Sequence, residues 1–513
     1  MHSTVMQPFV QGQLEHSRAH EARQDAHALI DAISDYDITG GLRLSFTGYS
    51  TFTQTGGPER TEVEISVGTP SKPSKRTVTK YVFKGCINTN IGSDNKERAH
   101  FYCRHCGRKL VRNGTVTTRL KDVPSGQNYS DMDVQRHRWL CTNKECHYCW
   151  TEPMDFKDRE HLLTCNLVTY ICDLLQTGLT MKDISIMTGV DKNTIKAIDK
   201  RRLNELYTED GKELKKPTEY SEYIGIDEFL LHKGHRYATV IIDLKTGHVL
   251  HLSHGKKNQT VYDFMKFVGD DWMRNVKAVA CDMNSDYEEA FKEKYPDVKI
   301  VFDHFHIVKN FNEKVVSEVR KDEQRRLIAE GRPEEAAALK GSKYILLTNT
   351  ETRKQKEKDA KENKVVARGG ELFKKPEIVQ KPGIEEAYQK LLKDNKLLFT
   401  IDFVKELIGK AYKAKKERGM KIFINQAIRV CRTTENKHFL WFARLLENHM
   451  DGIISHATMN ISSGRVEGTN NMIKTLRRKG YGYPDDDYFF LKIIDQSRKF
   501  SNEKSQSINK NLD

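Results

Sequence analysis

The stretch YIGIDEFLLHKGHRYATVIID, residues 223–243, decides the fold class of this chain. It holds two runs rich in apolar and β-branched residues, Tyr223–Leu231 and His235–Asp243, of the kind that forms strands. Gly234 lies between them, where a tight hairpin turn favours glycine. A third such run, His248–Ser253, follows after a second short turn. The sequence therefore predicts three strands joined by hairpins.

Helices and strands alternate after these hairpins. Helix-like segments at Gln259–Trp272 and Asp286–Tyr295 are each followed by a short apolar strand, Val276–Asp282 and then Val298–Phe302, and a long amphipathic helix begins near His306. Such an order predicts a mixed sheet covered by helices on both faces. It matches the ribonuclease-H-like fold, in which the first and fourth strands are neighbours.

Three acidic residues lie at positions where a carboxylate is unusual unless it binds a ligand. Asp227 lies inside the first apolar strand and Asp282 ends the fourth, so the fold would place them face to face. Glu467 starts a later helix that Ser462 or Ser463 could cap. A single strand-end aspartate is usually a turn or capping residue. Three acids in this order instead favour a site for two Mg²⁺ ions, about 3.5–4 Å apart, that acts on a phosphodiester.

The helix that carries Glu467 has a polar face of its own. Glu467, Asn471, Lys474 and Arg478 follow one another at helical spacing and share that face. We predict that the face begins with a metal ligand and continues with DNA contacts, and that Arg465 also contacts phosphate.

Half of the ten cysteines fall within one short segment. Clustering of this kind favours a structural zinc site in a reducing compartment over disulfides or unpaired buried thiols. The first two ligands are predicted to be Cys103 and Cys106, two residues apart in a turn that ends in glycine. The other pair is either Cys141 with Cys146 or Cys146 with Cys149. Basic residues flank the cluster, as in a module that grips DNA.

Residues 180–199 have the layout of a helix-turn-helix. Gly189 would make the turn and Asp191 would cap the second helix. An ordinary helical hairpin would show the same periodicity, but basic residues continue beyond the motif. The residues predicted to reach phosphates and base edges in a major groove are Lys192, Asn193, Thr194 and Lys196.

Composition points to a polyanionic partner. The 513 residues include 85 Lys and Arg against 71 Asp and Glu, a formal net charge of +14, and the pI is about 9.1. A chain of this length is too long for one hydrophobic core and predicts several domains. No apolar run reaches membrane-helix length, and Met1–Gln13 does not have the pattern of a signal peptide, so we expect a cytoplasmic protein without a membrane partner.

These motifs together resemble the DDE transposases of bacterial insertion sequences, in the subfamily with an N-terminal zinc ribbon and a helix-turn-helix. The likeness covers roughly residues 101–500. The segments that carry it are Cys103-Arg-His-Cys106 with Trp139-Leu-Cys141…Cys146, Gly225-Ile-Asp227-Glu228, Asp282-Met-Asn-Ser-Asp-Tyr287, Asp303-His304-Phe305-His306, and Gly464-Arg-Val-Glu467-Gly-Thr-Asn470-Asn471 followed by Gly480-Tyr-Gly-Tyr483.

The resemblance implies specific roles for these residues. Asp227, Asp282 and Glu467 would be the catalytic triad that holds two Mg²⁺ (or Mn²⁺) ions. Cys141 and Cys146, rather than Cys149, would complete a site for one structural Zn²⁺. The protein would act near the nucleoid, as a dimer on double-stranded DNA. There it would bind the terminal inverted repeats of its element and carry out strand cleavage and strand transfer into target DNA.

The predicted fold is a multidomain α+β chain. The predicted parts are an N-terminal extension of unknown role (1–100), a zinc ribbon (101–155), a helix-turn-helix (156–215), a ribonuclease-H-like catalytic domain (220–319 and 456–500) and a helical insertion (320–455). The insertion follows from the 185 positions between the second and third acids, 467 minus 282. Its charged tracts, such as Arg353–Lys364, are expected to be solvated faces or loops.

The sequence leaves open the roles of two histidines and a choice between the transposase and two other functions. His304 and His306 follow a strand that ends in Asp303, so they either assist the acids or simply cap and pack at a strand-to-helix junction. A domesticated DNA-binding regulator would not need the acids. A ribonuclease-H-like nuclease would cleave without joining. Terminal inverted repeats beside the coding region would favour the transposase.

Overall fold

The structure is a computed structural model, and its described part forms two compact units, Met1–Glu213 and Leu214–Asp513. Ser462 and Ser463, the predicted helix caps, lie outside the described residues, as do residues 1–51. The described residues are 52–69, 72–87, 101–283, 285–348, 350–362, 365–367, 378–379, 382–393, 395–459, 461, 464–480 and 482–509.

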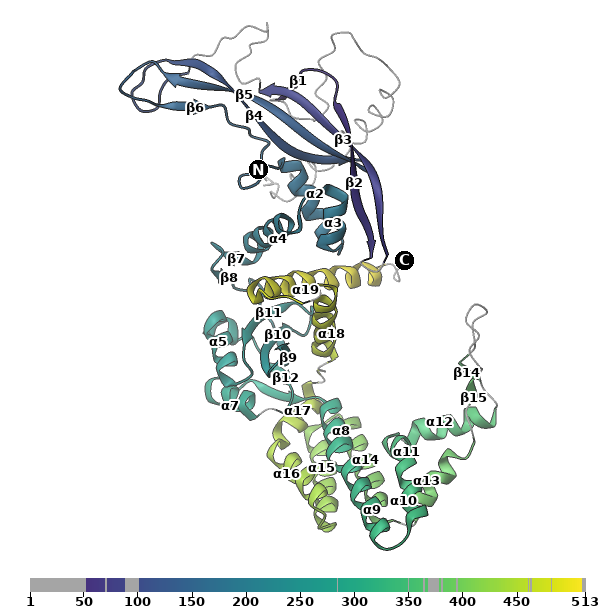
Figure 1. Ribbon diagram of the computed structural model, residues 1–513. Coiled ribbons are helices and arrows are strands. Elements are labelled where there is room, and N and C mark those ends of the chain that lie inside the picture. The colour runs from purple at the N-terminus through teal and green to yellow at the C-terminus, as the bar shows by residue number, and fades with distance from the viewer. Residues whose placement is uncertain are drawn as a thin grey trace. The chain divides into compact units, whose positions relative to one another are not determined.

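The first unit is built on a six-stranded sheet (Figure 1). Its strands are β1 (Phe52–Gln54), β2 (Glu59–Thr69), β3 (Lys72–Ile87), β4 (Leu110–Ser125), β5 (Asn128–Cys141) and β6 (Cys149–Thr151). The order is β1-β3-β5-β4, with β2 paired to β3 and β6 paired to β5. Strand β3 runs parallel to β5, with Lys80 opposite Tyr129. Residues 52–87 therefore share a sheet with the cysteine-bearing hairpin, and the domain boundary predicted at residue 100 falls between strands of one sheet.

Three helices follow the sheet in the same unit: α2 (Cys165–Gln176), α3 (Met181–Thr188) and α4 (Lys192–Tyr207). Helix α3 ends at Gly189, which adopts the left-handed conformation with φ 68°, and the Asp191 side chain caps α4. The turn between α3 and α4 is held on the sheet. The Tyr129 hydroxyl donates to the carbonyl of Ile186 (2.7 Å), and the Lys121 ammonium donates to the carbonyl of Gly189. Two short strands, β7 (Thr208–Glu209) and β8 (Glu213–Leu214), come next.

The second unit holds a five-stranded sheet of order β11-β10-β9-β12-β13. The first three strands in sequence are antiparallel, and β9, β12 and β13 are parallel. The register pairs Ala280 of β12 with Gly225 of β9. The predicted adjacency of the first and fourth strands is therefore confirmed. The strands are β9 (Tyr223–His232), β10 (Arg236–Asp243), β11 (Val249–His254), β12 (Ala278–Cys281) and β13 (Lys299–Phe302).

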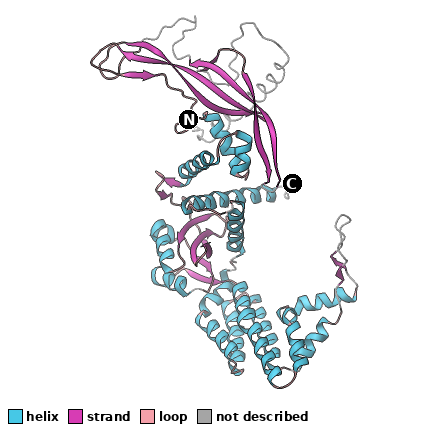
Figure 2. Cartoon of the chain, in the orientation of Figure 1, coloured by secondary structure: helices cyan, strands magenta, loops and turns pink. Residues whose placement is uncertain are grey.

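Helices cover both faces of this sheet, as Figures 1 and 2 show. Ile224 and Ile226 of β9 share a buried cluster with Phe264 of α5 and Phe291 of α7, whereas Gly225 faces α18. This alternation follows from the strand period of two. The covering helices are α5 (Asn258–Val268), α6 (Asp270–Met273), α7 (Ser285–Lys294), α18 (Gly464–Lys479) and α19 (Asp486–Asn509).

The described residues between β13 and α18 are mostly helical, and the helix nearest the sheet packs on β13. A Cβ atom at Gly452 would overlap the ring of Phe302, so α17 lies directly on β13. The helices are α8 (His304–Asn310), the π-helical turn η1 (Phe311–Val316), α9 (Ser317–Ala329), α10 (Pro333–Gly341), α11 (Lys343–Leu347), α12 (Thr350–Lys361), α13 (Ile384–Lys393), α14 (Lys396–Lys413), α15 (Glu417–Thr433), α16 (Lys437–Asn448) and α17 (Met450–Met459); two short strands, β14 (Val365–Ala367) and β15 (Ile378–Val379), lie between α12 and α13.

One charged residue of this helical part departs from the prediction. The tract Arg353–Lys364 was expected to be a solvated face or loop, and most of its described residues are exposed or half-buried, but Arg353 is only 1% exposed. Its guanidinium lies 3.4 Å from the centroid of the Tyr388 ring and donates to the Thr348 carbonyl at 2.7 Å. A buried cation survives here because hydrogen bonds and an aromatic face replace its water.

Within the described ranges, none of the helices combines the length and the apolar character that crossing a bilayer requires.

Candidate functional site

Helix α18 lies along strand β9 in the same direction. Near its start, Val466 packs over Gly225, and near its end the Arg477 guanidinium donates to the Leu230 carbonyl at 2.6 Å. The eleven positions from Val466 to Arg477 in the helix and the five positions from Gly225 to Leu230 in the strand each span about 16 Å. Helix and strand therefore advance by the same distance between these two contacts. The sheet-facing residues of α18 are consequently in register with the residues of β9.

Gly225 permits this close approach. A Cβ at this position would overlap Cγ2 of Val466 and lie 2.8 Å from Cδ2 of Leu244. We expect Gly225→Ala to lower the free energy of unfolding by about 1–3 kcal/mol, because the added methyl overpacks the contact. Val466→Ala in the same chain should recover most of that loss in a denaturant titration. Gly409→Ala, at an open helical position, is the control. An unaltered stability for Gly225→Ala would contradict this packing.

Asp227 is held by two hydrogen bonds. Its Oδ1 accepts from the backbone N–H of Glu228 at 2.7 Å, and its Oδ2 accepts from the side-chain amide of Asn470 at 2.6 Å. Burial is the main cause that raises the pKa of Asp227, and the nearby carboxylate of Asp282 adds to the rise. A half-buried carboxylate whose hydrogen-bond donors among the described residues are both neutral is a group that a bound metal ion would stabilise.

Asp282 follows the end of β12 and lies on the same side of the sheet as Asp227. Continuing the register of Ala280 and Gly225 by two residues places Asp282 beside Asp227. Its Oδ1 accepts from the Met283 backbone N–H at 2.6 Å and lies 3.3 Å from Nδ1 of His306. Two carboxylates, one within β9 and one directly after β12, thus lie on the same side of the sheet on neighbouring strands.

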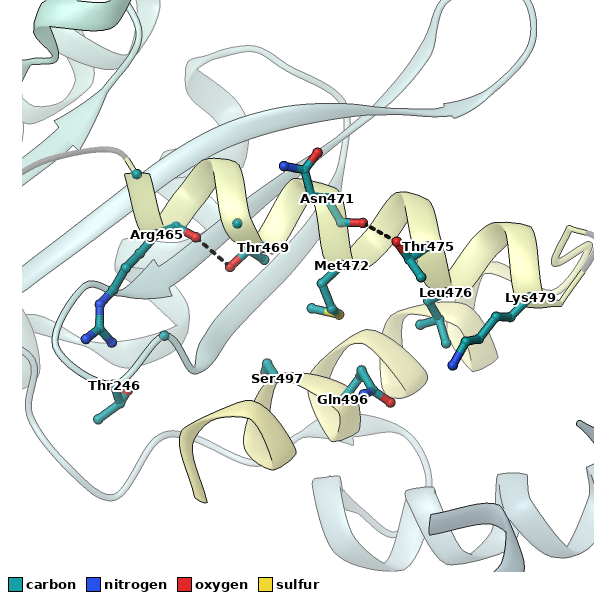
Figure 3. A pocket seen from close by; sticks show the side chains of 13 residues that line it. Thr246, Arg465, Thr469, Asn471, Met472, Thr475, Leu476, Lys479, Gln496 and Ser497 are labelled. Carbon is teal, nitrogen blue, oxygen red and sulfur yellow. Dashed lines mark hydrogen bonds between the residues drawn. The ribbon is translucent and has the colours of Figure 1, made fainter. Parts of the chain in front are cut away.

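Glu467 is exposed on one flank of α18. The opposite flank lines an open groove of about 430 Å³ beside the turn between β10 and β11, with Met472 and Leu476 pointing into it (Figure 3). Because the groove lies on the β10 side of α18, helical geometry directs Glu467 toward the β12 side, where Asp282 lies. We call Asp227, Asp282 and Glu467 the acid site.

The carboxylates of the acid site do not close around a single point. Among the described residues, three or more His, Cys, Asp or Glu ligand atoms lie within 4.8 Å of one another only in a group of four cysteines, and the acid site does not meet this criterion. Two ions a few ångströms apart need no such convergence, since each ion can bind a different pair of acids. The donor set, carboxylates on two neighbouring strands and on a facing helix, fits divalent ions that prefer oxygen.

The residues predicted to contact DNA lie on different flanks of α18. Lys474 and Arg478 are exposed on the flank of Glu467. Asn471 is among the residues that line the groove, although its side chain points the opposite way from Met472 and Leu476 (Figure 3). Arg465 lies on the other flank, near Gly247, and lines the groove. The structure therefore groups Lys474 and Arg478 with Glu467, separates Arg465 from them, and leaves Asn471 between the two flanks.

The two histidines have different surroundings. His306 lies against Asp282, in the acid site. His304 packs on the ring of Tyr412, with centroids 4.3 Å apart, and burial lowers its pKa. The sequence analysis gave no role to Asn470, which contacts Asp227. Its spacing was the available signal, because a polar residue four positions after Val466 and three before Ile473 falls on the face of α18 that packs on the sheet.

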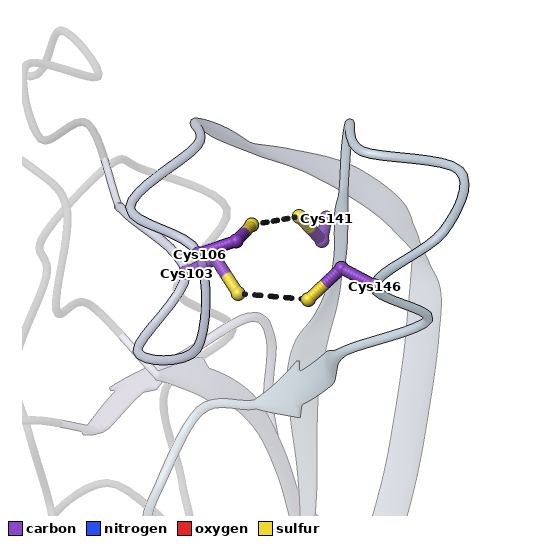
Figure 4. A group of neighbouring side chains, drawn as sticks. All are labelled: Cys103, Cys106, Cys141 and Cys146. Atoms are coloured by element: carbon purple, nitrogen blue, oxygen red, sulfur yellow. Dashed lines mark hydrogen bonds between the residues drawn. The ribbon is translucent and has the colours of Figure 1, made fainter.

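Four cysteines meet at one end of the β4–β5 hairpin (Figure 4). The Sγ atoms of Cys103 and Cys146 are 3.5 Å apart, and those of Cys106 and Cys141 are 3.4 Å apart. Tetrahedral zinc with bonds of about 2.3 Å requires sulfur atoms about 3.8 Å apart, so the arrangement fits that ion. Cys149 is exposed in β6 and stays outside the group.

The backbone shapes both halves of this cysteine cluster alike. The residue after each second cysteine adopts a left-handed conformation, Gly107 with φ 70° and His147 with φ 52°. A hydrogen bond from the Arg108 backbone N–H lowers the pKa of Cys106 to about 7, which favours its thiolate. Burial, aided by the neighbouring sulfurs, raises the pKa of Cys146 to about 12. A bound cation would relieve that crowding of thiolates.

The candidate recognition helix α4 presents its first turn to solvent. Lys192 and Asn193 are exposed, and Lys196 is half-buried. The hydroxyl of Thr194 donates to the Asp191 carboxylate at 2.5 Å. That bond belongs to the cap of α4, so Lys192 and Asn193 are the residues best placed for contact with a ligand.

Comparison with known proteins supports one family. Residues 224–493, just over half of the chain, match the ISL3 group of DDE transposases, described as transposase. The chain is 27% identical over 393 residues to the transposase for insertion sequence element IS1001 of Bordetella parapertussis, which covers 76% of this chain and 87% of that protein. It is 24% identical over 278 residues to the transposase for insertion sequence element IS1557 of Mycobacterium tuberculosis, covering 51% and 56%. The chain belongs to the DDE transposases of bacterial insertion sequences, enzymes that cut DNA with divalent metal ions.

Proposed function

We propose that this transposase binds the terminal inverted repeats of its own insertion sequence and cleaves and transfers DNA strands at Asp227, Asp282 and Glu467. One observation carries the proposal. Asn470, three positions after Glu467 on α18, donates to Asp227, and the register of β9 with β12 continues to Asp282, so helical geometry would direct Glu467 toward the two aspartates. The strand order of the sheet, three antiparallel strands followed by two parallel ones, supports a ribonuclease-H-like catalytic domain.

The acid site would hold two Mg²⁺ or Mn²⁺ ions. When bound, such ions activate the attacking oxygen and stabilise the leaving oxygen at a phosphodiester. The chain's own residues prepare for this. Asn470 and the Glu228 backbone fix the two oxygens of Asp227, and His306 lies against Asp282. Lys474 and Arg478, on the flank of Glu467, are positioned to contact phosphates next to the scissile bond.

We propose further roles for the parts around this domain. The cysteine cluster would hold one structural Zn²⁺ ion, so residues 101–155 would serve as a zinc ribbon joined to the strands of residues 52–87. Residues 156–215 would bind the terminal repeats through α4, and the helices of residues 320–455 would form an insertion within the catalytic domain. The enzyme would work as a dimer, because two element ends must be joined to one target.

Charge on α4 should contribute directly to DNA affinity. We expect Lys192→Ala to weaken binding to a terminal-repeat duplex and to reduce the slope of log affinity against log salt by about one, as for the loss of one phosphate contact. Lys75→Ala is the control, since Lys75 is an exposed lysine of the same unit that pairs with Glu64 at 2.8 Å. Equal affinities and slopes for wild type and Lys192→Ala would remove α4 from the DNA interface.

Labelled duplexes that end in the repeats of the element test the function as a whole. In the presence of Mg²⁺, we expect cleavage at the repeat ends and joining of the freed 3′ ends to a target duplex. Duplexes with scrambled ends should stay intact. Cleavage without joining would identify a nuclease, and binding without cleavage in Mg²⁺ or Mn²⁺ would identify a DNA-binding regulator.

A further inference from the structure

A neutral amide, rather than a cation, holds the first acid of the site. Asn470 is 8% exposed, and its Nδ2 atom donates to Oδ2 of Asp227 at 2.6 Å across 243 positions of sequence. The other oxygen of Asp227 is held by the Glu228 backbone N–H. Both oxygens of the carboxylate are thus oriented by donors that carry no charge.

The chemistry of this contact suits a carboxylate that must bind a metal ion. A lysine or arginine at position 470 would neutralise Asp227 and compete with the metal. An amide donor orients the carboxylate and leaves its negative charge available. The orientation of the amide is set as well, because turning it over would place Oδ1 of Asn470 against the carboxylate.

Asn470 retains a polar atom that the described fold does not use. Its Oδ1 is buried and has no hydrogen-bond partner among the described residues. A buried acceptor without a partner is unfavourable, so packing alone does not account for an asparagine here. An apolar side chain of similar size would fill the same space without that penalty.

The position of Asn470 on α18 extends its effect to a second acid. It lies one helical turn after Glu467, between the Val466 contact to Gly225 and the Arg477 contact to Leu230. The hydrogen bond to Asp227 therefore helps to hold the register of the helix on the strand. Loss of this bond would free one oxygen of the Asp227 carboxylate and loosen the position of Glu467, while the contacts of Val466 and Arg477 still hold the helix on the strand.

We propose that Asn470 is a positioning residue of the acid site: it orients Asp227 for a divalent ion and helps to hold the helix of Glu467 in register. The inference rests on the proposed function, in which Asp227 and Glu467 are metal ligands. Outer-shell partners of metal ligands are known to matter strongly, and their loss commonly lowers metal affinity or activity about 10- to 100-fold.

Mn²⁺ binding to the full-length, zinc-loaded protein tests this without any strand cleavage. We expect Asn470→Ala to weaken Mn²⁺ binding about 10- to 100-fold in an electron paramagnetic resonance titration, while binding to terminal-repeat DNA and thermal stability stay unchanged. Saturating Mn²⁺ should then restore much of the cleavage. Asn448→Ala, which removes an exposed amide at the end of α16, is the matched control. If Asn470→Ala does not fold, Asn470→Leu, which keeps the side-chain size, carries the same test.

The outcomes separate this inference from the function on which it rests. Asp227→Asn should weaken Mn²⁺ binding, and excess Mn²⁺ should not restore its cleavage. If Asp227→Asn weakens Mn²⁺ binding while the folded Asn470 variant binds Mn²⁺ as wild type does, the inference is overturned and the acid site stands. A loss of cleavage in the Asn470 variant that excess Mn²⁺ does not reverse also overturns it. If Asp227→Asn leaves Mn²⁺ binding unchanged, the proposed acid site itself fails.

Discussion

Glu467→Gln is expected to lower strand cleavage at the element ends by more than about 100-fold and to leave DNA binding intact. The substitution keeps the size of the side chain and removes the charge of a proposed metal ligand. Loss of an outer-shell partner already costs about 10- to 100-fold, so loss of the ligand itself should cost more. Cleavage of a labelled repeat-end duplex in Mg²⁺, beside a gel-shift titration of the same duplex, measures both quantities.

Because Glu467 is exposed, the experiment can separate an effect on catalysis from an effect on folding. A charge change at an exposed site on α18 should hardly alter folding, so lost cleavage would report on chemistry. Asp487→Asn makes the same kind of change at an exposed residue in the first turn of α19 and should cleave as wild type does. Wild-type cleavage by Glu467→Gln would show that the third acid lies elsewhere in the chain.

Cys106→Ser is expected to lose the zinc ion and to unfold the end of the β4–β5 hairpin. The local core there is small, with Cys103, Leu110, Trp139 and Cys141 as its buried members. Zinc contributes about 10–16 kcal/mol in small zinc-binding peptides, far more than so few apolar residues supply. Zinc content should fall from one ion per chain toward none, and the fluorescence of Trp139 should shift toward that of an exposed indole.

Cys149→Ser is the matched control for this experiment. Cys149 is exposed and lies three residues after Cys146, at the spacing that made it a rival ligand in the sequence. We expect this variant to retain one zinc ion and a buried Trp139. If Cys149→Ser loses zinc while Cys141→Ser keeps it, the proposed ligand set is wrong and the second half of the site must rearrange.

Local patterns in the sequence were sufficient to predict the strands, helix and turn that carry the proposed site residues. Runs of apolar and β-branched residues predict the strands around Asp227 and Asp282, helical spacing predicts the helix that begins near Glu467, and glycine with an aspartate cap predicts the turn before α4. These features depend on neighbours within a few residues. The adjacency of the first and fourth strands followed from their order, because few topologies accommodate that succession of strands and helices.

Contacts between distant segments were decided by the tertiary structure alone. The pairing of β3 with β5 joins residues 52–87 to the cysteine-bearing hairpin. Packing buries Arg353 in a tract that reads as solvated, and the separation of the Sγ atoms brings Cys141, and not Cys149, into the cysteine cluster. Asn470 meets Asp227 only because α18 and β9 advance together over about 16 Å. Each of these contacts depends on the register and packing of elements far apart in the chain, which no local spacing of residues encodes.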